Sequence, residues 1–188
     1  VTYKIPILEY MTGLGILAAE SNGIEKASHI RERFVDVVNY TETTKALASA
    51  AYHDPENFGG SGMYIASLLK SNMAKLYFAS HFHEFVRGIQ DICGGILVTQ
   101  PTYQDWKHEE LNPYLQKYMG GAGNFNAEER LKLMSMLHHL VASDVAGWHE
   151  VATIHGEGSF AAQKMMMLAE APIKMYKEIA KKAVGLNV

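Results

Sequence analysis

An uninterrupted helical pattern from about Ile24 to Tyr52 restricts the fold more than any other segment of the sequence. This segment contains no Gly and no Pro, and the side chains of its expected buried stripe recur at helical spacing. They are Ala27, Ile30, Phe34, Val37, Val38 and Thr41. At 1.5 Å per residue the helix would be roughly 40 Å long, which is long for a globular protein. This length predicts a bundle, in which other helices cover the apolar stripe.

The rest of the sequence is also predicted to be almost entirely helical, with no strand pair and no internal repeat. Helices are expected over 5–20, 24–52, 63–94, 109–119 and 126–153, and after Ser159, with loops over 53–62 and 99–107. Pro172 should kink or restart the last helix. Gly13 and Gly15 are expected where another helix packs closely. The sequence therefore predicts an all-α fold, an antiparallel bundle of five long or medium helices in a single domain over residues 1–188.

Composition excludes several classes of protein. The chain has 188 residues, 48% of them hydrophobic, and a formal charge of −3, which suits one domain with an unaided core. Cys93 is the single cysteine, which excludes an internal disulfide and favours the cytoplasm. The 17 basic residues are scattered among 20 acidic ones and no apolar run is long, so we expect neither nucleic-acid binding nor membrane insertion. The first residue is Val1 rather than Met, which fits a processed product or part of a longer polypeptide.

The stretch from His83 to Pro101 combines a helix end with two glycines. The apolar spacing continues to Ile92, and Gly94-Gly95 then ends the pattern. Glycines allow another backbone or a phosphate to approach, and Gln90 can present an amide one turn earlier. From these residues alone, the stretch is either a helix end with a packed exit loop or a ligand contact.

The segment from His155 to Ser159 is a second candidate site. Its two glycines are expected to expose backbone N–H groups beside His155 and Glu157 at a helix start, which suits an anionic ligand. A half-buried Glu157 can act as a base, and Glu150 and His149, a turn earlier, are candidates for the same site. The alternative is that Glu157 and Glu150 are ordinary helix-terminus carboxylates.

Familiar catalytic and metal-binding motifs are absent. The sequence has no nucleophile elbow, no phosphate-binding glycine loop with Lys, no HExxH motif and no spaced set of Cys and His. His81 and His83 are two residues apart, so on a helix they point about 200° away from each other. We predict no metal site within this chain.

Three separated segments resemble one group of flavoproteins. They are NGIEKASHIR (22–31), QDICGGILVTQP (90–101) and HGEGS (155–159). The sequence is similar to the C-terminal helical domain of the 4-hydroxyphenylacetate 3-hydroxylase family, and within it to the 4-hydroxybutyryl-CoA dehydratase/vinylacetyl-CoA isomerase branch. The resemblance covers essentially the whole chain but only that domain of the family.

The resemblance implies a fold and a set of cofactor contacts. The family has an acyl-CoA dehydrogenase-like fold with a helical domain, a middle β-domain and a C-terminal bundle, usually assembled as a homotetramer. In the related acyl-CoA dehydrogenases, a Gln and a following glycine pair contact the diphosphate side of FAD bound by a neighbouring subunit. The resemblance thus assigns FAD contacts to Gln90, Gly94 and Gly95.

The resemblance also implies a place for the catalytic base. Acyl-CoA dehydrogenases carry a catalytic Glu in the loop before the last long helix, where this sequence has Glu157 near His155. The dehydratase branch usually has a small residue there and places its carboxylate slightly upstream, so Ala152 or Glu150 is the other comparison point.

Dehydratases of this branch also hold a [4Fe-4S] cluster on three cysteines and one histidine, which belong to regions upstream of the resemblance. Cys93 stands where the family usually has a small residue, so we do not expect it to be a ligand. Upstream residues or a companion chain would therefore supply the cluster ligands and enclose the flavin.

Three functions are compatible with the resemblance. The first is the flavin- and CoA-ester-binding domain of a 4-hydroxybutyryl-CoA dehydratase/vinylacetyl-CoA isomerase-like enzyme, favoured because residues 27–31 look closer to that branch. The second is the oxygenase component of an FAD-dependent aromatic hydroxylase, which uses reduced FAD and O₂ on a phenol and needs no cluster. The third is a non-catalytic helical assembly subunit.

Overall fold

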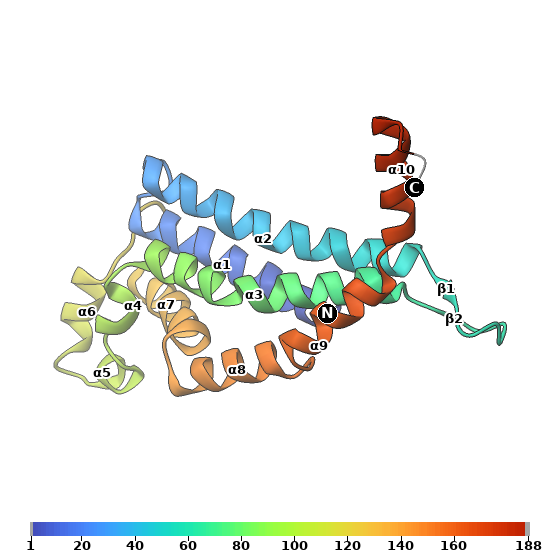
Figure 1. The fold of residues 1–188 in the computed structure, drawn as a ribbon. Coiled ribbons are helices and arrows are strands. Elements are labelled where there is room, and N and C mark those ends of the chain that lie inside the picture. Colours follow the sequence, from blue (N-terminus) through green and yellow to red (C-terminus); the bar gives the residue numbers. More distant parts are fainter. Residues whose placement is uncertain (1, 187–188) are drawn as a thin grey trace.

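The computed structural model describes residues 2–186 and shows the antiparallel helical bundle that the sequence predicts. Three long helices run side by side: α1 (Ile5–Asn22), α2 (Ser28–His53) and α3 (Leu68–Cys93) (Figure 1). The remaining helices are η1 (Thr2–Lys4), α4 (Ile96–Thr99), α5 (Tyr103–Lys107), α6 (Asn112–Tyr118), α7 (Ala127–Val141), α8 (Asp144–His155), α9 (Phe160–Glu170) and α10 (Ile173–Val184).

The core is organised around α3, which contacts α1, α2, α7, α8 and α9. The rings of Phe78, Phe82 and Phe85 follow one another along α3, with centroids 5.0 and 6.1 Å apart. Ile89 and Ile92 continue this buried row to the end of the helix. Burying each side chain of this size contributes about 1.5–3 kcal/mol. The row is therefore a main source of the free energy that holds the bundle together.

Strong local signals predicted several helix ends correctly. Gly23 ends α1 with φ +69°, and its N–H donates to carbonyl groups of the last turn. Asn126 and Glu129 form the expected capping box at the start of α7. Ser159 caps α9, and Pro172 separates α9 from α10.

The start of α3 differs from the prediction, and the expectation of no strand pair was wrong. A short antiparallel hairpin pairs β1 (Glu56–Asn57) with β2 (Tyr64–Ile65), closed by a bond from the Phe58 N–H to the Met63 carbonyl. Helix α3 starts only at Leu68, because the Ser67 hydroxyl accepts a bond from the Lys70 N–H. Residues predicted as the first turn of the helix, from Met63 on, belong to the hairpin and its exit.

The segment predicted as one helix over 126–153 is two helices. The Ser143 hydroxyl donates to the His139 carbonyl and accepts from the Ala146 N–H, so this one side chain ends α7 and caps α8. The loop predicted over 99–107 contains α5, which begins with a capping box of Thr102 and Asp105. The helix predicted over 109–119 is shortened to α6. The side chain of one residue, Ser143, breaks the predicted helix, and the side chain of Thr102 starts a helix in the predicted loop.

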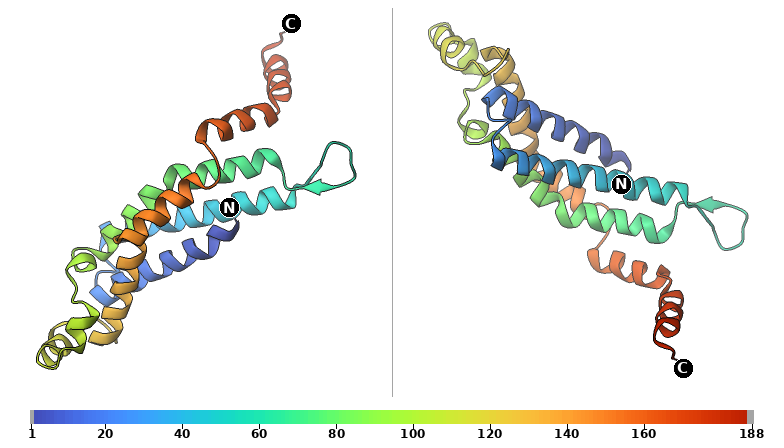
Figure 2. Two further views of the ribbon diagram at one scale, coloured as in Figure 1. Left: turned by 90° about the horizontal axis from the view of Figure 1, so that it is seen from below. Right: turned by 90° about the horizontal axis from the view of Figure 1, so that it is seen from above.

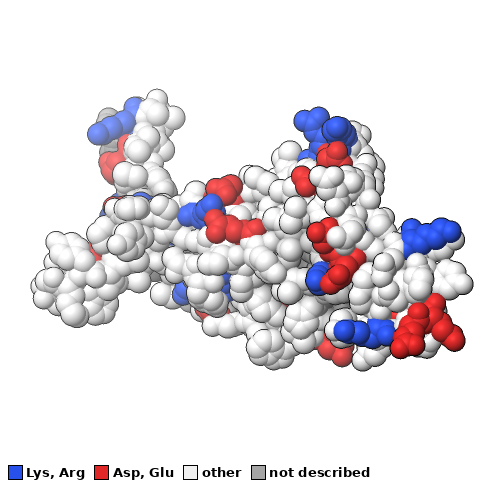
Figure 3. All heavy atoms as spheres, turned by 180° about the vertical axis from the view of Figure 1, so that it is seen from behind, with Lys and Arg blue, Asp and Glu red and all other residues white. Residues whose placement is uncertain are grey.

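The hairpin and α10 project from the bundle (Figure 2). Large apolar side chains are exposed on α8, α9 and α10, among them Val145, Trp148, Val151, Met165, Leu168 and Ile179. Charged side chains on the face shown in Figure 3 form small clusters of mixed sign separated by uncharged surface. Within residues 2–186, no helix combines the length and the apolar character needed to cross a membrane.

The two glycines of α1 have different surroundings. A Cβ on Gly15 would lie 2.9 Å from Cδ1 of Ile89, so α1 and α3 pack closely there, as predicted. A Cβ on Gly13 would meet nothing within 4 Å, so the expectation of close packing was wrong at this exposed position.

This difference predicts opposite effects on stability. Gly13→Ala should raise the free energy of unfolding by about 0.5–1 kcal/mol, because Ala is the better helix former and the space is open. Gly15→Val should lower it by about 1–3 kcal/mol, because its methyl groups would be forced against Ile89. Urea unfolding monitored by circular dichroism measures both. Equal changes in the two variants would contradict the packing described here.

Candidate functional site

A buried ion pair joins the start of the chain to the loop between α8 and α9. Nζ of Lys4 lies 3.0 Å from Oε1 of Glu157, and the side chains are only 2% and 8% exposed. The same ammonium donates to the Thr153 carbonyl at 2.6 Å and lies 4.2 Å from the centroid of the Phe78 ring. Three parts of the chain, α3, α8 and the α8–α9 loop, therefore surround the Lys4 ammonium.

Burial and nearby charges shift the pKa values of several side chains at and around the pair. Burial lowers the pKa of Lys4, while its hydrogen bond and attraction to Glu157 act in the opposite direction. Burial also raises the pKa of Tyr40, to which Tyr77 and Glu157 add, and the Tyr40 hydroxyl donates to the Phe78 carbonyl at 2.8 Å. Burial and the nearby Lys4 charge lower the pKa of His149. The pair thus lies in a dry environment that penalises charge.

The backbone of the α8–α9 loop is fixed by glycine and by a buried amide. Gly158 has φ +96°, a conformation that other residues rarely adopt. Gln163 is buried and donates to the carbonyls of Glu157 and Gly158 at 3.4 and 3.2 Å. The N–H groups of Gly156 and Gly158 donate to the carbonyls of Ala152 and His155. The expectation that these N–H groups are exposed for an anion was therefore wrong.

Glu150 and His155 are not part of the buried pair. The Glu150 carboxylate is 22% exposed and pairs with Nδ1 of His83 on α3. His155 is exposed at the end of α8. His149 is closer to the pair, since its Nε2 lies 3.4 Å from the Thr153 hydroxyl and Thr153 binds Lys4 through its carbonyl. Of the predicted catalytic residues, only Glu157 lies in a buried, charged environment.

Gln90, Gly94 and Gly95 lie together at the end of α3. The Gln90 side chain donates from Nε2 to the Val141 carbonyl at 2.5 Å, which ties α3 to α7. A Cβ built on Gly94 or Gly95 would meet nothing within 4 Å, and both residues are exposed. Within residues 2–186, the Gly95 N–H has no hydrogen-bond acceptor. Open space and an available donor fit the approach of a diphosphate.

The two groups of predicted site residues are well separated. Phe78 lies against Lys4, and Cys93 precedes the glycine pair, so the two positions are 15 residues apart on α3. At 1.5 Å per residue this is roughly 22 Å along the helix axis. The glycine pair and Glu157 are therefore too far apart to form one compact site.

The structure also bears on metal binding. Among the described residues, no group of three or more His, Cys, Asp or Glu side chains is arranged to hold a metal ion. Cys93 is buried, and burial raises the pKa of its thiol to about 12. A thiol of this kind is a poor ligand because metals bind the thiolate.

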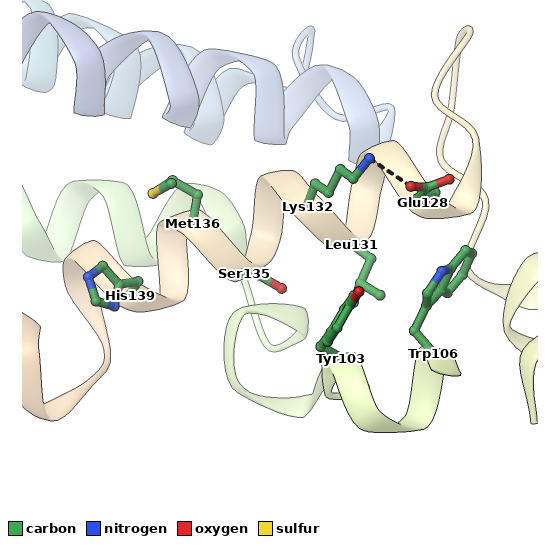
Figure 4. Close-up of a pocket in the computed structure, with 8 residues that line it drawn as sticks. All are labelled: Tyr103, Trp106, Glu128, Leu131, Lys132, Ser135, Met136 and His139. Carbon is green, nitrogen blue, oxygen red and sulfur yellow. Dashed lines mark ion pairs between the residues drawn. The ribbon is translucent and has the colours of Figure 1, made fainter. Parts of the chain in front are cut away.

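A pocket of about 470 Å³ lies between α5 and α7 (Figure 4). Tyr103 and Trp106 line it from α5, and the ion pair between Glu128 and Lys132, with Oε1 and Nζ 2.7 Å apart, lies along α7. None of the predicted site residues lines this pocket. We take the buried pair, rather than this apolar pocket, as the candidate catalytic centre, because it holds the groups that can transfer a proton.

Comparison with known proteins places the chain in a family. The family model described as HpaB, 4-hydroxyphenylacetate 3-hydroxylase C terminal, matches residues 1–185. The chain belongs to the 4-hydroxyphenylacetate 3-hydroxylase family. As the sequence predicted, it corresponds to the C-terminal domain of that family.

Two groups of curated relatives are similar to this family member. The 4-hydroxybutyryl-CoA dehydratase/vinylacetyl-CoA Δ-isomerase of Clostridium aminobutyricum is 28% identical over 194 residues, which cover 98% of this chain and 39% of that enzyme. The 4-hydroxyphenylacetate 3-monooxygenase oxygenase component of Pseudomonas aeruginosa is 23% identical over 165 residues, which cover 87% of this chain and 32% of the relative. The chain thus spans about two-fifths of the dehydratase.

Solved structures agree with the fold. An oxygen-tolerant archaeal 4-hydroxybutyryl-CoA dehydratase from N. maritimus superposes with a TM-score of 0.87 at 26% identity, covering 98% of this chain and 37% of that one. HpaB, the oxygenase component of 4-hydroxyphenylacetate 3-monooxygenase, complexed with FAD and 4-hydroxyphenylacetate, gives 0.89 at 20% identity, covering 97% and 38%. The acyl-CoA dehydrogenase-like bundle expected from the sequence is therefore confirmed.

Sequence reasoning missed Lys4. A signal was present, because Lys4, Leu8, Met11 and Gly15 recur at the spacing of one helix face and all four are buried. A lysine in that stripe was not recognised because lysines are rarely buried without a partner, and the partner lies 153 positions later in the chain.

The lowered pKa of His149 predicts a pH dependence of stability. The unfolded chain binds a proton near the ordinary pKa of 6.5, and the folded chain binds it only at lower pH. Because the unfolded state binds more protons in this window, the free energy of unfolding should fall as the pH drops below about 6.5. Urea unfolding at a series of pH values should show a smaller decline in His149→Gln. An unchanged decline in that variant would contradict the burial effect.

Proposed function

We propose that this chain is the C-terminal domain of a larger flavoenzyme that dehydrates a 4-hydroxyacyl-CoA, as in 4-hydroxybutyryl-CoA dehydratase/vinylacetyl-CoA isomerase. The identity of 28% to the curated dehydratase, against 23% to the oxygenase component of P. aeruginosa, supports this branch. The geometric observation that carries the proposal is the buried, lysine-paired carboxylate of Glu157. A carboxylate in a dry site is suited to proton abstraction.

Glu157 is the proposed general base. It takes a proton from a carbon of the acyl chain: the C–H bond breaks, an O–H bond forms on the carboxylate, and the electron pair moves toward the thioester carbonyl. Aromatic rings near the pair, including Phe78 and Tyr40, exclude water from this part of the site. Glu150 and His155, also predicted from the sequence, have weaker support because Glu150 pairs with an exposed histidine and His155 is exposed.

FAD is the proposed cofactor and would supply the redox chemistry of the complete enzyme. Gln90, Gly94 and Gly95 are its proposed contacts, on the diphosphate side, from a subunit next to the one that holds most of the flavin. The open space at both glycines supports this assignment. A [4Fe-4S] cluster, if the dehydratase branch applies, would take its ligands from outside this chain, since the described residues contain no group suited to it.

The remaining parts of the enzyme are proposed to be upstream domains or a companion chain, assembled as a cytoplasmic homotetramer. The coverage of only 39% and 37% of the dehydratases supports further domains. The exposed apolar side chains of α8 to α10 support them too, because monomeric soluble proteins rarely leave such surface uncovered.

A second candidate is the oxygenase component of an aromatic hydroxylase. The superposition on HpaB with FAD and 4-hydroxyphenylacetate supports it at the level of fold. One set of measurements on the purified full-length protein separates the candidates. We expect bound FAD, iron and sulfide, and loss of water from 4-hydroxybutyryl-CoA. A cluster-free protein that hydroxylates a phenol with reduced FAD and O₂ would favour the hydroxylase. A colourless protein without FAD would favour the non-catalytic subunit.

Substitution of the base gives a specific prediction for the dehydratase. Glu157→Gln in the full-length enzyme should lower kcat by roughly 10²- to 10⁴-fold, because it removes the proton acceptor and keeps the shape. Steady-state kinetics with 4-hydroxybutyryl-CoA measures the loss. Glu84→Gln, which changes an exposed carboxylate paired with Arg87, is the matched control. If Glu157→Gln keeps full activity and Glu150→Gln loses activity, the general base is Glu150 rather than Glu157.

A bulky residue at Gly95 tests the flavin contact. Gly95→Leu should leave the fold stable, because a Cβ there meets nothing within 4 Å and φ is −60°, yet it should lower the amount of FAD retained on purification. Gly13→Leu, at an open position on α1, is the control. Gln90→Ala should also weaken retention, at a cost of about 1 kcal/mol for its lost bond to Val141. Unchanged flavin content in Gly95→Leu would contradict a contact between Gly95 and FAD.

A further inference from the structure

We infer that Asn22 and Arg130 are positioning residues for the glycine pair, Gly94 and Gly95, at the end of α3. They hold the peptide group that leads into this turn, and through it they set the direction of the Gly95 N–H. The inference rests on the proposed function for the ligand, which is FAD. The hydrogen bonds that carry it lie within this chain.

Asn22 is the last residue of α1, and its side-chain amide lies between a donor and an acceptor. Its Nδ2 donates to the Cys93 carbonyl at 3.3 Å, and its Oδ1 accepts from Nη2 of Arg130 at 2.7 Å. A guanidinium can only donate and a carbonyl can only accept, so one orientation of the amide satisfies both. Arg130 thereby directs the Asn22 donor at the end of α3.

The Arg130 guanidinium is itself held by the loop between α6 and α7. Its Nη1 donates to the carbonyls of Met119 and Gly120 at 3.5 and 3.3 Å. The same loop packs on the end of α1, where the Ala122 N–H donates to the Ser21 carbonyl at 2.8 Å. The acceptors of Arg130 named here are uncharged oxygens, so they do not neutralise its charge. A positive charge at this end of the bundle favours an anionic ligand such as a diphosphate.

The bond from Asn22 fixes the peptide group between Cys93 and Gly94. Its carbonyl accepts from Asn22, and its N–H donates to the Gln90 carbonyl at 3.0 Å. The turn that follows depends on glycine, because Gly94 has φ +67° and ψ −164°. The chain therefore enters this turn from a peptide group that is held on both sides.

The next peptide group carries the Gly95 N–H. Its carbonyl, from Gly94, accepts from the Leu97 N–H at 3.2 Å, while the Gly95 N–H has no acceptor among the residues that the structure describes. Bonds within the turn give its local shape, whereas the Asn22 bond places the turn relative to α1. Loss of the Asn22 bond should therefore let the turn shift and weaken its contact with the diphosphate.

A contact that serves only the fold is the alternative. The last carbonyls of a helix need hydrogen-bond partners, and Asn22 supplies one for Cys93. Asn22→Asp separates the two roles, because a carboxylate still accepts from Arg130 but cannot donate to the Cys93 carbonyl. This variant keeps the link between α1 and α7 and removes the link to the end of α3.

The test measures two quantities in the full-length protein. They are the hydrogen exchange of peptide 90–101 after removal of FAD, by mass spectrometry, and the dissociation constant of FAD, by fluorescence titration. In Asn22→Asp we expect faster exchange in this peptide and a dissociation constant raised about 3- to 10-fold, as for the loss of one hydrogen bond. Arg130→Met should act in the same direction. Arg130→Lys should restore most of the affinity, because it can still donate to Asn22.

Asn72→Ala is the matched control. The Asn72 amide donates to the Leu68 carbonyl at 2.8 Å near the start of α3, roughly 30 Å along the helix axis from Cys93. Asn72→Ala and Asn22→Ala should lower the midpoint of urea unfolding by similar amounts, since each loses one amide bond. Of these two variants, only Asn22→Ala should also change the exchange of peptide 90–101 and the affinity for FAD.

Unchanged FAD affinity in Asn22→Asp, at a time when Gly95→Leu does lose FAD, would overturn the positioning role. An equal loss of affinity in Asn72→Ala would overturn it too, because the effect would then follow from stability alone. If Gly95→Leu retains FAD while Asn22→Asp exchanges faster, the proposed flavin contact fails and the effect of Asn22 on the turn remains. The two failures are therefore distinguishable.

Discussion

The buried ion pair between Lys4 and Glu157 places the strictest demand on the structure around it, because both charged groups lose their contact with water. It joins the start of the chain to the loop between α8 and α9, so the enclosing helices must be in place before the pair is stable. Phe78 and Thr153 provide the contacts that offset the loss of water around the ammonium. Helix α3, helix α8 and the α8–α9 loop together enclose this pair.

Helix α3 connects this pair to the other candidate contact. Its middle carries Phe78 next to the Lys4 ammonium. Gln90 lies near its end, and the open glycine pair follows Cys93, which is roughly 22 Å from Phe78 along the axis. The aromatic and aliphatic side chains between them form a continuous buried row. A rigid helix of this length can hold the two candidate sites at a fixed separation.

Most of the fold could be predicted because its signals are local. Gly23, the Asn126–Glu129 capping box, Ser159 and Pro172 each act within one helical turn, and each ended or started a helix as predicted. The break at Ser143 was missed because Ser is also tolerated inside helices, and only its bonds to both neighbouring helices decide. Of the two residues in the buried pair, the sequence indicated only one. Glu157 was recognised by its loop, whereas its burial and Lys4, its partner, depend on contacts across the whole chain.

The most direct test of this account is an experimental structure of the full-length protein with FAD and an unreacted CoA ester. The account predicts diphosphate oxygens within hydrogen-bond distance of the Gly95 N–H, and the acyl chain beside the Glu157 carboxylate with Lys4 still paired to it. A structure in which protein covers the glycine pair and the acyl chain lies far from Glu157 would contradict it.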